Sequence, residues 1–172
     1  MVPQIWSVAF LALGIAVAPV RAQDTEPAPV KIAVFDFELE DSTPSAALLS
    51  KPTTGAAAMD KVSNAAREEL ARSGHFIVID ASKSDAKPVA QKALRDCDGC
   101  EAGIAQQLGA QQSLIGVVSK VTQTDYYVVI RIRDARTGKI LDQQEANFAG
   151  DEQGWATGVR MLIRHQVLGG IP

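Results

Sequence analysis

The sequence contains few aromatic residues, which make up only 5% of its 172 residues. Sites that stack nucleic-acid bases or sugar rings need several aromatic side chains, so this composition argues against both. Positive charge is also limited, because 17 Lys and Arg residues stand against 20 Asp and Glu residues and the formal net charge is −3. We therefore predict that neither nucleic acid nor an anionic membrane surface is a partner.

Groups that commonly carry out catalysis are scarce as well. The chain has two histidines, His75 and His165, and neither lies within a catalytic or metal-binding motif. The sequence contains no nucleophile elbow, glycine-rich phosphate loop or paired-histidine metal motif. We therefore expect a protein that is not an enzyme, and we predict no cofactor and no metal ion.

One long hydrophobic run is present, at the N-terminus. Residues Ile5–Val20 carry no charge, and small residues flank Arg21 up to Ala22. This pattern predicts a secretory signal peptide over residues 1–22, cleaved after Ala22. The run is shorter than the ~20 residues that a membrane-spanning helix needs. We expect a periplasmic protein that is not inserted in the membrane after cleavage, and no cysteine lies near the cut to carry a lipid.

The rest of the chain has the composition of one globular domain, with 47% hydrophobic and 22% charged residues overall. Residues 23–30 are polar and contain proline, which predicts a flexible lead. We predict a single α/β domain over residues 31–168. Its first strand, Lys31–Glu38, is apolar on both faces until Asp36, as in a strand covered by helices on both sides. Strict alternation would place Phe35 and Phe37 on the same face.

The order of the remaining elements predicts a mixed five-stranded sheet with about three helices. The sheet begins parallel and continues as an antiparallel meander, with Lys31–Glu38 in the centre and Lys139–Phe148 at the edge. A long loop, Leu39–Ala58, follows the first strand. The other predicted helices and strands are Gly55–Gly74, His75–Asp80, Glu101–Leu108, Ser113–Gln123, Asp125–Asp134 and Glu152–Leu168.

Periodicity also predicts which side chains are buried. Arg67, Arg131 and Arg133 are expected to face water. The predicted core positions are Met59, Val62, Ala66, Leu70, Ile104, Ala105, Leu108, Tyr126, Val128, Ile130, Ile132, Trp155, Val159, Leu162, Ile163 and Val167.

The two cysteines form a Cys97-x-x-Cys100 motif. In an exported protein this pair is expected to be oxidised. Three interpretations remain open: a structural disulfide that fixes the start of the following helix, a redox-active pair, or part of a metal site. Two thiolates supply only half of a zinc site, and the sequence places neither histidine nearby.

Carboxylates follow the first two predicted strands at their C-terminal ends, where open α/β sheets commonly bind ligands. Asp36, Glu38 and Asp80, joined by Glu40 and Asp41, therefore form a possible acidic edge cluster. Such a cluster could hold a divalent cation or act as a phosphate-accepting pocket. Alternatively, the carboxylates cap loops and face water, which we favour, since the predicted antiparallel meander and the export signal both argue against a phosphate-accepting domain.

Several sequence blocks resemble an uncharacterised family of small exported proteobacterial proteins. The resemblance extends over about residues 30–168. It is carried, in order, by I-A-V-F-D-F-E, R-S-G-H-F-I-V-I-D, C-x-x-C-E, A-Q-Q-L-G-A-Q, I-G-V-V-S-K-V, R-D-A-R-T-G-K and D-E-Q-G-W. More distantly, the pattern is similar to the amino-terminal domain of TolB and to the curli-secretion and penicillin-binding-protein-activator lipoproteins. The resemblance implies an α/β unit used for protein contacts in the bacterial envelope.

These observations favour a non-enzymatic periplasmic module that binds an envelope or periplasmic protein. The predicted edge strand and the long loop are its candidate contact surfaces. The alternative is a thiol–disulfide accessory that uses Cys97 and Cys100.

Overall fold

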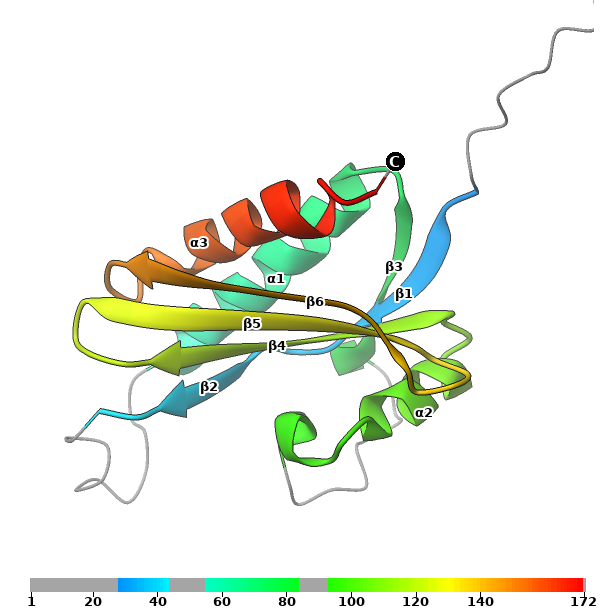
Figure 1. Cartoon of the computed structure of the whole chain (residues 1–172), viewed down its shortest axis with the longest axis horizontal. Coiled ribbons are helices and arrows are strands. Elements are labelled where there is room, and N and C mark those ends of the chain that lie inside the picture. The colour runs from blue at the N-terminus through cyan, green and yellow to red at the C-terminus, as the bar shows by residue number, and fades with distance from the viewer. Residues whose placement is uncertain (1–27, 44–54, 84–92, 172) are drawn as a thin grey trace, which may run out of the picture.

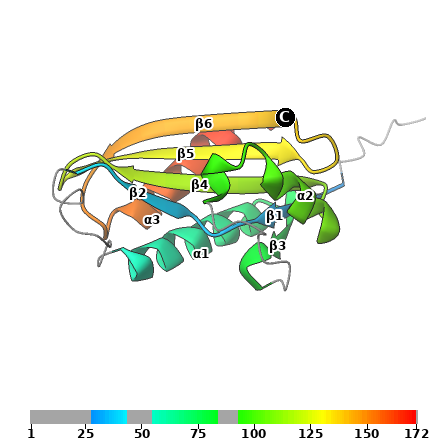
Figure 2. The ribbon, with the colours of Figure 1, turned by 90° about the horizontal axis from the view of Figure 1, so that it is seen from below.

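The computed structural model describes residues 28–43, 55–83 and 93–171 (Figure 1). The predicted signal peptide, most of the flexible lead and the middle of the loop Leu39–Ala58 lie outside the described residues. Within them, one mixed sheet forms the centre of the molecule. Two helices cover one face of the sheet and a third lies on the other face (Figures 1 and 2).

The sheet has the predicted topology. Its strands run in the order β3 (Phe76–Asp80), β1 (Val30–Val34), β4 (Gln112–Lys120), β5 (Asp125–Asp134) and β6 (Ile140–Ala149). β1 pairs in parallel with both β3 and β4, whereas β4, β5 and β6 form the antiparallel meander. The fold class, the inner position of the first strand and the edge position of β6 are thus confirmed.

The first predicted strand is in fact two strands. β1 ends at Val34, and β2 (Glu38–Asp41) then pairs with a later part of β4, so the sheet has six strands. Between them the chain changes face. Phe35 packs in the core on the face covered by one helix, α2 (Cys100–Gln107), whereas Phe37 packs in the core on the face covered by the other two helices. The prediction that both rings share a face was therefore wrong. The Phe37 ring lies over Gly116, where a Cβ atom would overlap it, and the Phe37 N–H donates to Ser63 Oγ at 2.9 Å.

Three helices complete the domain. α1 (Ala56–Arg72) and α3 (Trp155–Leu162) pack on the same face of the sheet, and α3 continues as a π-helical turn, Ile163–Val167. α2 (Cys100–Gln107) lies on the other face. No helix in the described part of the chain is long and apolar enough to cross a membrane.

The core on the α1 and α3 face is formed largely by the predicted residues. The core positions predicted in Gly55–Gly74, Asp125–Asp134 and Glu152–Leu168 are all buried, whereas Ile104 and Leu108 on the α2 side are only partly buried. Tyr126 stacks on Phe148 with ring centroids 5.4 Å apart and also contacts Trp155. The smaller core on the α2 face consists of five alanines with Phe35, Leu94 and Ile115.

Candidate functional site

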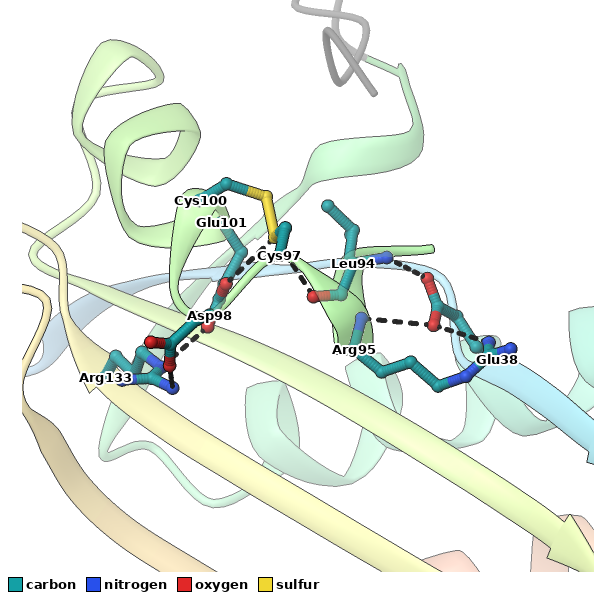
Figure 3. The surroundings of a disulfide bond; sticks show 8 residues. All are labelled: Glu38, Leu94, Arg95, Cys97, Asp98, Cys100, Glu101 and Arg133. Atoms are coloured by element: carbon teal, nitrogen blue, oxygen red, sulfur yellow. Dashed lines mark hydrogen bonds and ion pairs between the residues drawn. A yellow bond between two sulfur atoms is a disulfide. The ribbon is translucent and has the colours of Figure 1, made fainter. Parts of the chain in front are cut away.

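The cysteine pair lies in a turn between a short 3-10 helix (Leu94–Asp96) and α2 (Figure 3). Cys97 and Cys100 form a disulfide, with their Cα atoms 5.6 Å apart. Asp98 and Gly99 have φ angles of 48° and 99°, in the left-handed region that closes a tight turn. The bond therefore closes the turn at the start of α2, where the sequence predicted that a structural disulfide would act.

A buried ion pair lies directly beneath this turn. Glu101, in the first turn of α2, is 1% exposed, and its Oε1 is 2.9 Å from Nε of Arg133 on β5. The prediction that Arg133 faces water was wrong, because its side chain lies against Gly99 in the disulfide turn and pairs with Glu101. Arg133 also donates to the Gly138 carbonyl at 2.9 Å and lies 3.6 Å from the Asp98 carboxylate. The pair thus ties the disulfide turn to the β5–β6 connection.

Glu101 also faces the disulfide. Its Oε2 lies 3.9 Å from Cys97 Sγ, while its other oxygen faces Arg133. The two sulfurs and a Glu101 oxygen lie within 4.8 Å of one another, a combination that could supply three metal ligands if the sulfurs were thiolates. From the sequence we considered only the two sulfurs as ligands, so Glu101 was missed. The signal was present, since Glu101 directly follows Cys100.

The predicted acidic edge cluster is divided between the two faces of the sheet. Arg67 of α1 lies between Asp36 and Asp80, with its Nη2 2.7 Å and 3.0 Å from their carboxylates. Arg67 is therefore mostly buried rather than directed at water, which corrects the expectation for this residue. Glu38 instead points toward the α2 side, where it accepts from the Leu94 N–H at 2.6 Å and pairs with Arg95 at 2.9 Å (Figure 3).

These carboxylates have structural partners that oppose cation binding. Burial alone would raise the pKa of Asp80, but hydrogen bonds from Ser82 and Lys83 and the charge of Arg67 outweigh it and leave that pKa below its usual value. The hydrogen bond from Thr43 lowers the pKa of Asp41. An arginine already occupies the space between Asp36 and Asp80, so the geometry favours the interpretation in which the acids hold loops and helices in place.

A pocket of about 420 Å³ opens where the C-terminal end of the chain meets one end of the sheet. Its lining is largely apolar, and its polar residues are three glutamines together with His75 and Asp142. The residues that line it include Phe76, Gln112, Ile132, Leu141, Gln144, Gln166, Val167 and Ile171. The size and the mixture of apolar walls with a few polar groups are typical of binding pockets. Nothing in the periodicity of the sequence indicated it, because its walls come from all five strands of the main sheet order and the C-terminal segment.

The pocket adjoins the open edge of the sheet. No described strand pairs with the outer side of β6, and its residues alternate between exposed and half-buried. At the start of β6, Ile140 and Leu141 are 50% and 53% exposed, and Leu141 also lines the pocket. An apolar surface, a pocket and a free strand edge therefore meet at one place.

A comparison with models of known protein families assigns the chain to one family. The model of a family described as "Protein of unknown function (DUF2380)" matches residues 30–167. The chain belongs to this family. A comparison with curated protein sequences finds no match.

Solved structures share the fold at low identity. Lipoprotein GNA1162 from Neisseria meningitidis is 16% identical with a TM-score of 0.53, and the match covers 84% of this chain and 100% of that one. The PelC dodecamer from Paraburkholderia phytofirmans is 18% identical with a TM-score of 0.50, covering 80% and 86%. The C-terminal domain of LpoB from Salmonella enterica is 16% identical with a TM-score of 0.48, covering 73% and 86%. At these identities the likeness shows the fold alone.

Proposed function

We propose that this protein is a non-enzymatic accessory module that binds a protein partner in the periplasm. The proposal rests on the position of Leu141, which lies on the edge strand β6 and also lines the largely apolar pocket. A ten-residue strand with one unpaired side offers backbone N–H and C=O groups to a further strand. The pocket would then receive an apolar side chain of the same partner segment.

The chemistry of the pocket suits a polypeptide. Gln112, Gln144 and Gln166 present side-chain amides, which can donate to and accept from a peptide backbone. Phe76, Ile132 and Val167 supply apolar walls, which suit an aliphatic or aromatic side chain. The exposed Ile140 and Leu141 extend this surface along the edge, and clustered apolar exposure of this kind is typical of interaction sites.

The envelope location is supported by the N-terminal sequence and by the fold. Residues 1–22 have the features of a signal peptide, and one protein of the same fold is a lipoprotein from a bacterium. We expect the exported protein to begin at Gln23, which an intact-mass measurement on the periplasmic fraction would establish. Recovery of a chain that still begins at Met1 in the membrane fraction would contradict the proposed location.

The proposed contact can be tested with one substitution and a matched control. Leu141→Lys places a charge at the pocket and the edge, whereas Val121→Lys changes a side chain of similar exposure, 50%, just after β4. Tagged unmodified protein and both variants would be purified from native periplasm, and the proteins recovered with each would be quantified. We expect Leu141→Lys to lose the partner and Val121→Lys to keep it. Equal recovery with both variants would refute the assigned surface.

A thiol–disulfide accessory is the second candidate, supported by the Cys97–Cys100 bond itself. The carboxylate of Glu101 weighs against it, because a negative charge 3.9 Å from Cys97 Sγ disfavours a thiolate there. A Glu101 oxygen also lies within 4.8 Å of Cys100 Sγ, so the position of Cys100 at the start of α2 is the feature that would favour a thiolate there. Equilibration with glutathione followed by thiol trapping would separate the candidates, since a redox pair gives mixed disulfides at one cysteine.

A further inference from the structure

Three side chains of types that commonly bind metal ions meet beneath the turn at residues 97–100. The sulfurs of Cys97 and Cys100 and a carboxylate oxygen of Glu101 all lie within 4.8 Å of one another (Figure 3). The carboxylate is held in this position because Arg133 binds its other oxygen. In the oxidised protein the two sulfurs are bonded to each other and cannot act as thiolate ligands.

We propose that the reduced protein binds Zn²⁺ or a similar thiophilic divalent cation through Cys97, Cys100 and Glu101. A dithiol reductant would break the S–S bond, leave two thiols on this chain and itself become a disulfide. Binding of the cation would then release both thiol protons to solvent, because the thiolate is the ligand. Three protein ligands leave the fourth tetrahedral position to water.

The spacing of the ligands is compatible with such a site. Zinc binds thiolates at about 2.3 Å and carboxylates at about 2.0–2.2 Å, so two sulfurs on one tetrahedral ion lie about 3.8 Å apart. The sulfurs of Cys97 and Cys100 must therefore move apart by rotation about their Cα–Cβ bonds. Their Cα atoms, 5.6 Å apart on a tight turn, already place both side chains on the Glu101 side.

The surrounding charges also balance. Two thiolates and one carboxylate carry three negative charges, of which a divalent cation neutralises two. The guanidinium of Arg133, 2.9 Å from Glu101 and largely buried, neutralises the third. A largely buried group of ions is tolerated when its charges are paired. While both thiols are protonated, Glu101 and Arg133 already cancel, and once the thiols ionise a divalent cation is needed to keep the group neutral. The site is thus available in one redox state and closed by the disulfide in the other.

This inference is independent of the proposed partner surface, because the cysteine turn lies on the α2 side of the sheet and the pocket does not include it. Failure of either proposal therefore leaves the other in place.

The test uses the mature protein, reduced with a dithiol and freed of reductant under anaerobic conditions. Titration with Zn²⁺ followed by calorimetry should show one ion per chain, and Co²⁺ should produce a thiolate-to-metal absorption band. Glu101→Gln should weaken Zn²⁺ binding by at least about tenfold. Asp98→Asn is the matched control, since this carboxylate lies in the same turn but is exposed, and it should bind as the unmodified protein does.

Several results would overturn the proposal. Equal Zn²⁺ binding by the oxidised protein, or by Cys97→Ser/Cys100→Ser, would show an adventitious site elsewhere. Unchanged affinity in a folded Glu101→Gln variant would remove Glu101 from the ligand set. If that variant does not fold, X-ray absorption spectroscopy of Zn²⁺ bound to the unmodified reduced protein would identify the ligand atoms instead. Two sulfur ligands together with oxygen ligands are expected, and any other sulfur count contradicts the site.

Discussion

Loss of the buried charge on Glu101 should destabilise the protein more than any surface charge change. The Glu101 side chain is 1% exposed and that of Arg133 is 9% exposed, so Glu101→Gln leaves a guanidinium with little access to water. Removal of one partner from a buried ion pair typically costs about 3–5 kcal/mol. Since Arg133 keeps the Gly138 carbonyl and the Asp98 carboxylate, we expect a loss near the lower end, about 3 kcal/mol.

The assay is urea and thermal unfolding of the oxidised mature protein. A loss of this size corresponds to a fall in melting temperature of roughly 6–12 °C for a domain of this length. The control is Glu68→Gln, which breaks the exposed pair Glu68–Arg160 and should cost no more than about 1 kcal/mol. Removing both buried charges in Glu101→Leu/Arg133→Met should cost less than the two single changes added together. A Glu101→Gln variant as stable as Glu68→Gln would refute this account of the pair.

Three further predictions concern stability. A hydrogen bond from Arg164 lowers the pKa of Glu69 below its ordinary value. The ionised Glu69 therefore stabilises the folded protein above about pH 4.5, and this contribution is lost as the pH falls through the lowered pKa. Arg164→Gln should therefore reduce the difference between urea midpoints at neutral pH and about pH 3. Gly116→Ala should cost about 1–3 kcal/mol in urea unfolding, because the added methyl overlaps the phenylalanine ring above it, and an unchanged midpoint would contradict that contact. Cys97→Ala/Cys100→Ala should fold and keep its partner, with a loss of about 2 kcal/mol or less because the closed loop is short. Ready reduction of the native bond by a glutathione buffer would instead favour the redox candidate.

Hydrophobic periodicity was sufficient to predict the layers of the fold, because long amphipathic helices and strands bury one continuous stripe of apolar side chains. The α3 residues from Trp155 to Val167 and the inward side of β5 were predicted correctly for this reason. Phe37 was misplaced because a break of only a few residues reverses the alternation, and the stretch has no glycine or proline to mark it.

The candidate sites were harder to predict, since they depend on where distant segments cross. Arg133 lies at a polar position of an alternating strand, and its burial comes from the distant disulfide turn and Glu101, against which its side chain lies. Likewise, the acids Asp36 and Glu38 follow the same strand, yet the break in the chain sends them to different arginines, Arg67 and Arg95. The pocket is lined by residues from β3, β1, β4, β5 and β6 and from the C-terminal segment, so no local sequence pattern could predict it.

Site-specific photo-crosslinking in the periplasm would show directly whether a protein partner binds at the β6 edge. A photoreactive residue at Gln143, exposed on β6, would be compared with the same residue at Gln123, exposed in the turn between β4 and β5. We expect a defined crosslinked species at Gln143 that mass spectrometry identifies as this chain joined to one protein, and none at Gln123. Equal crosslinking at both positions, or no crosslink at Gln143, would contradict it.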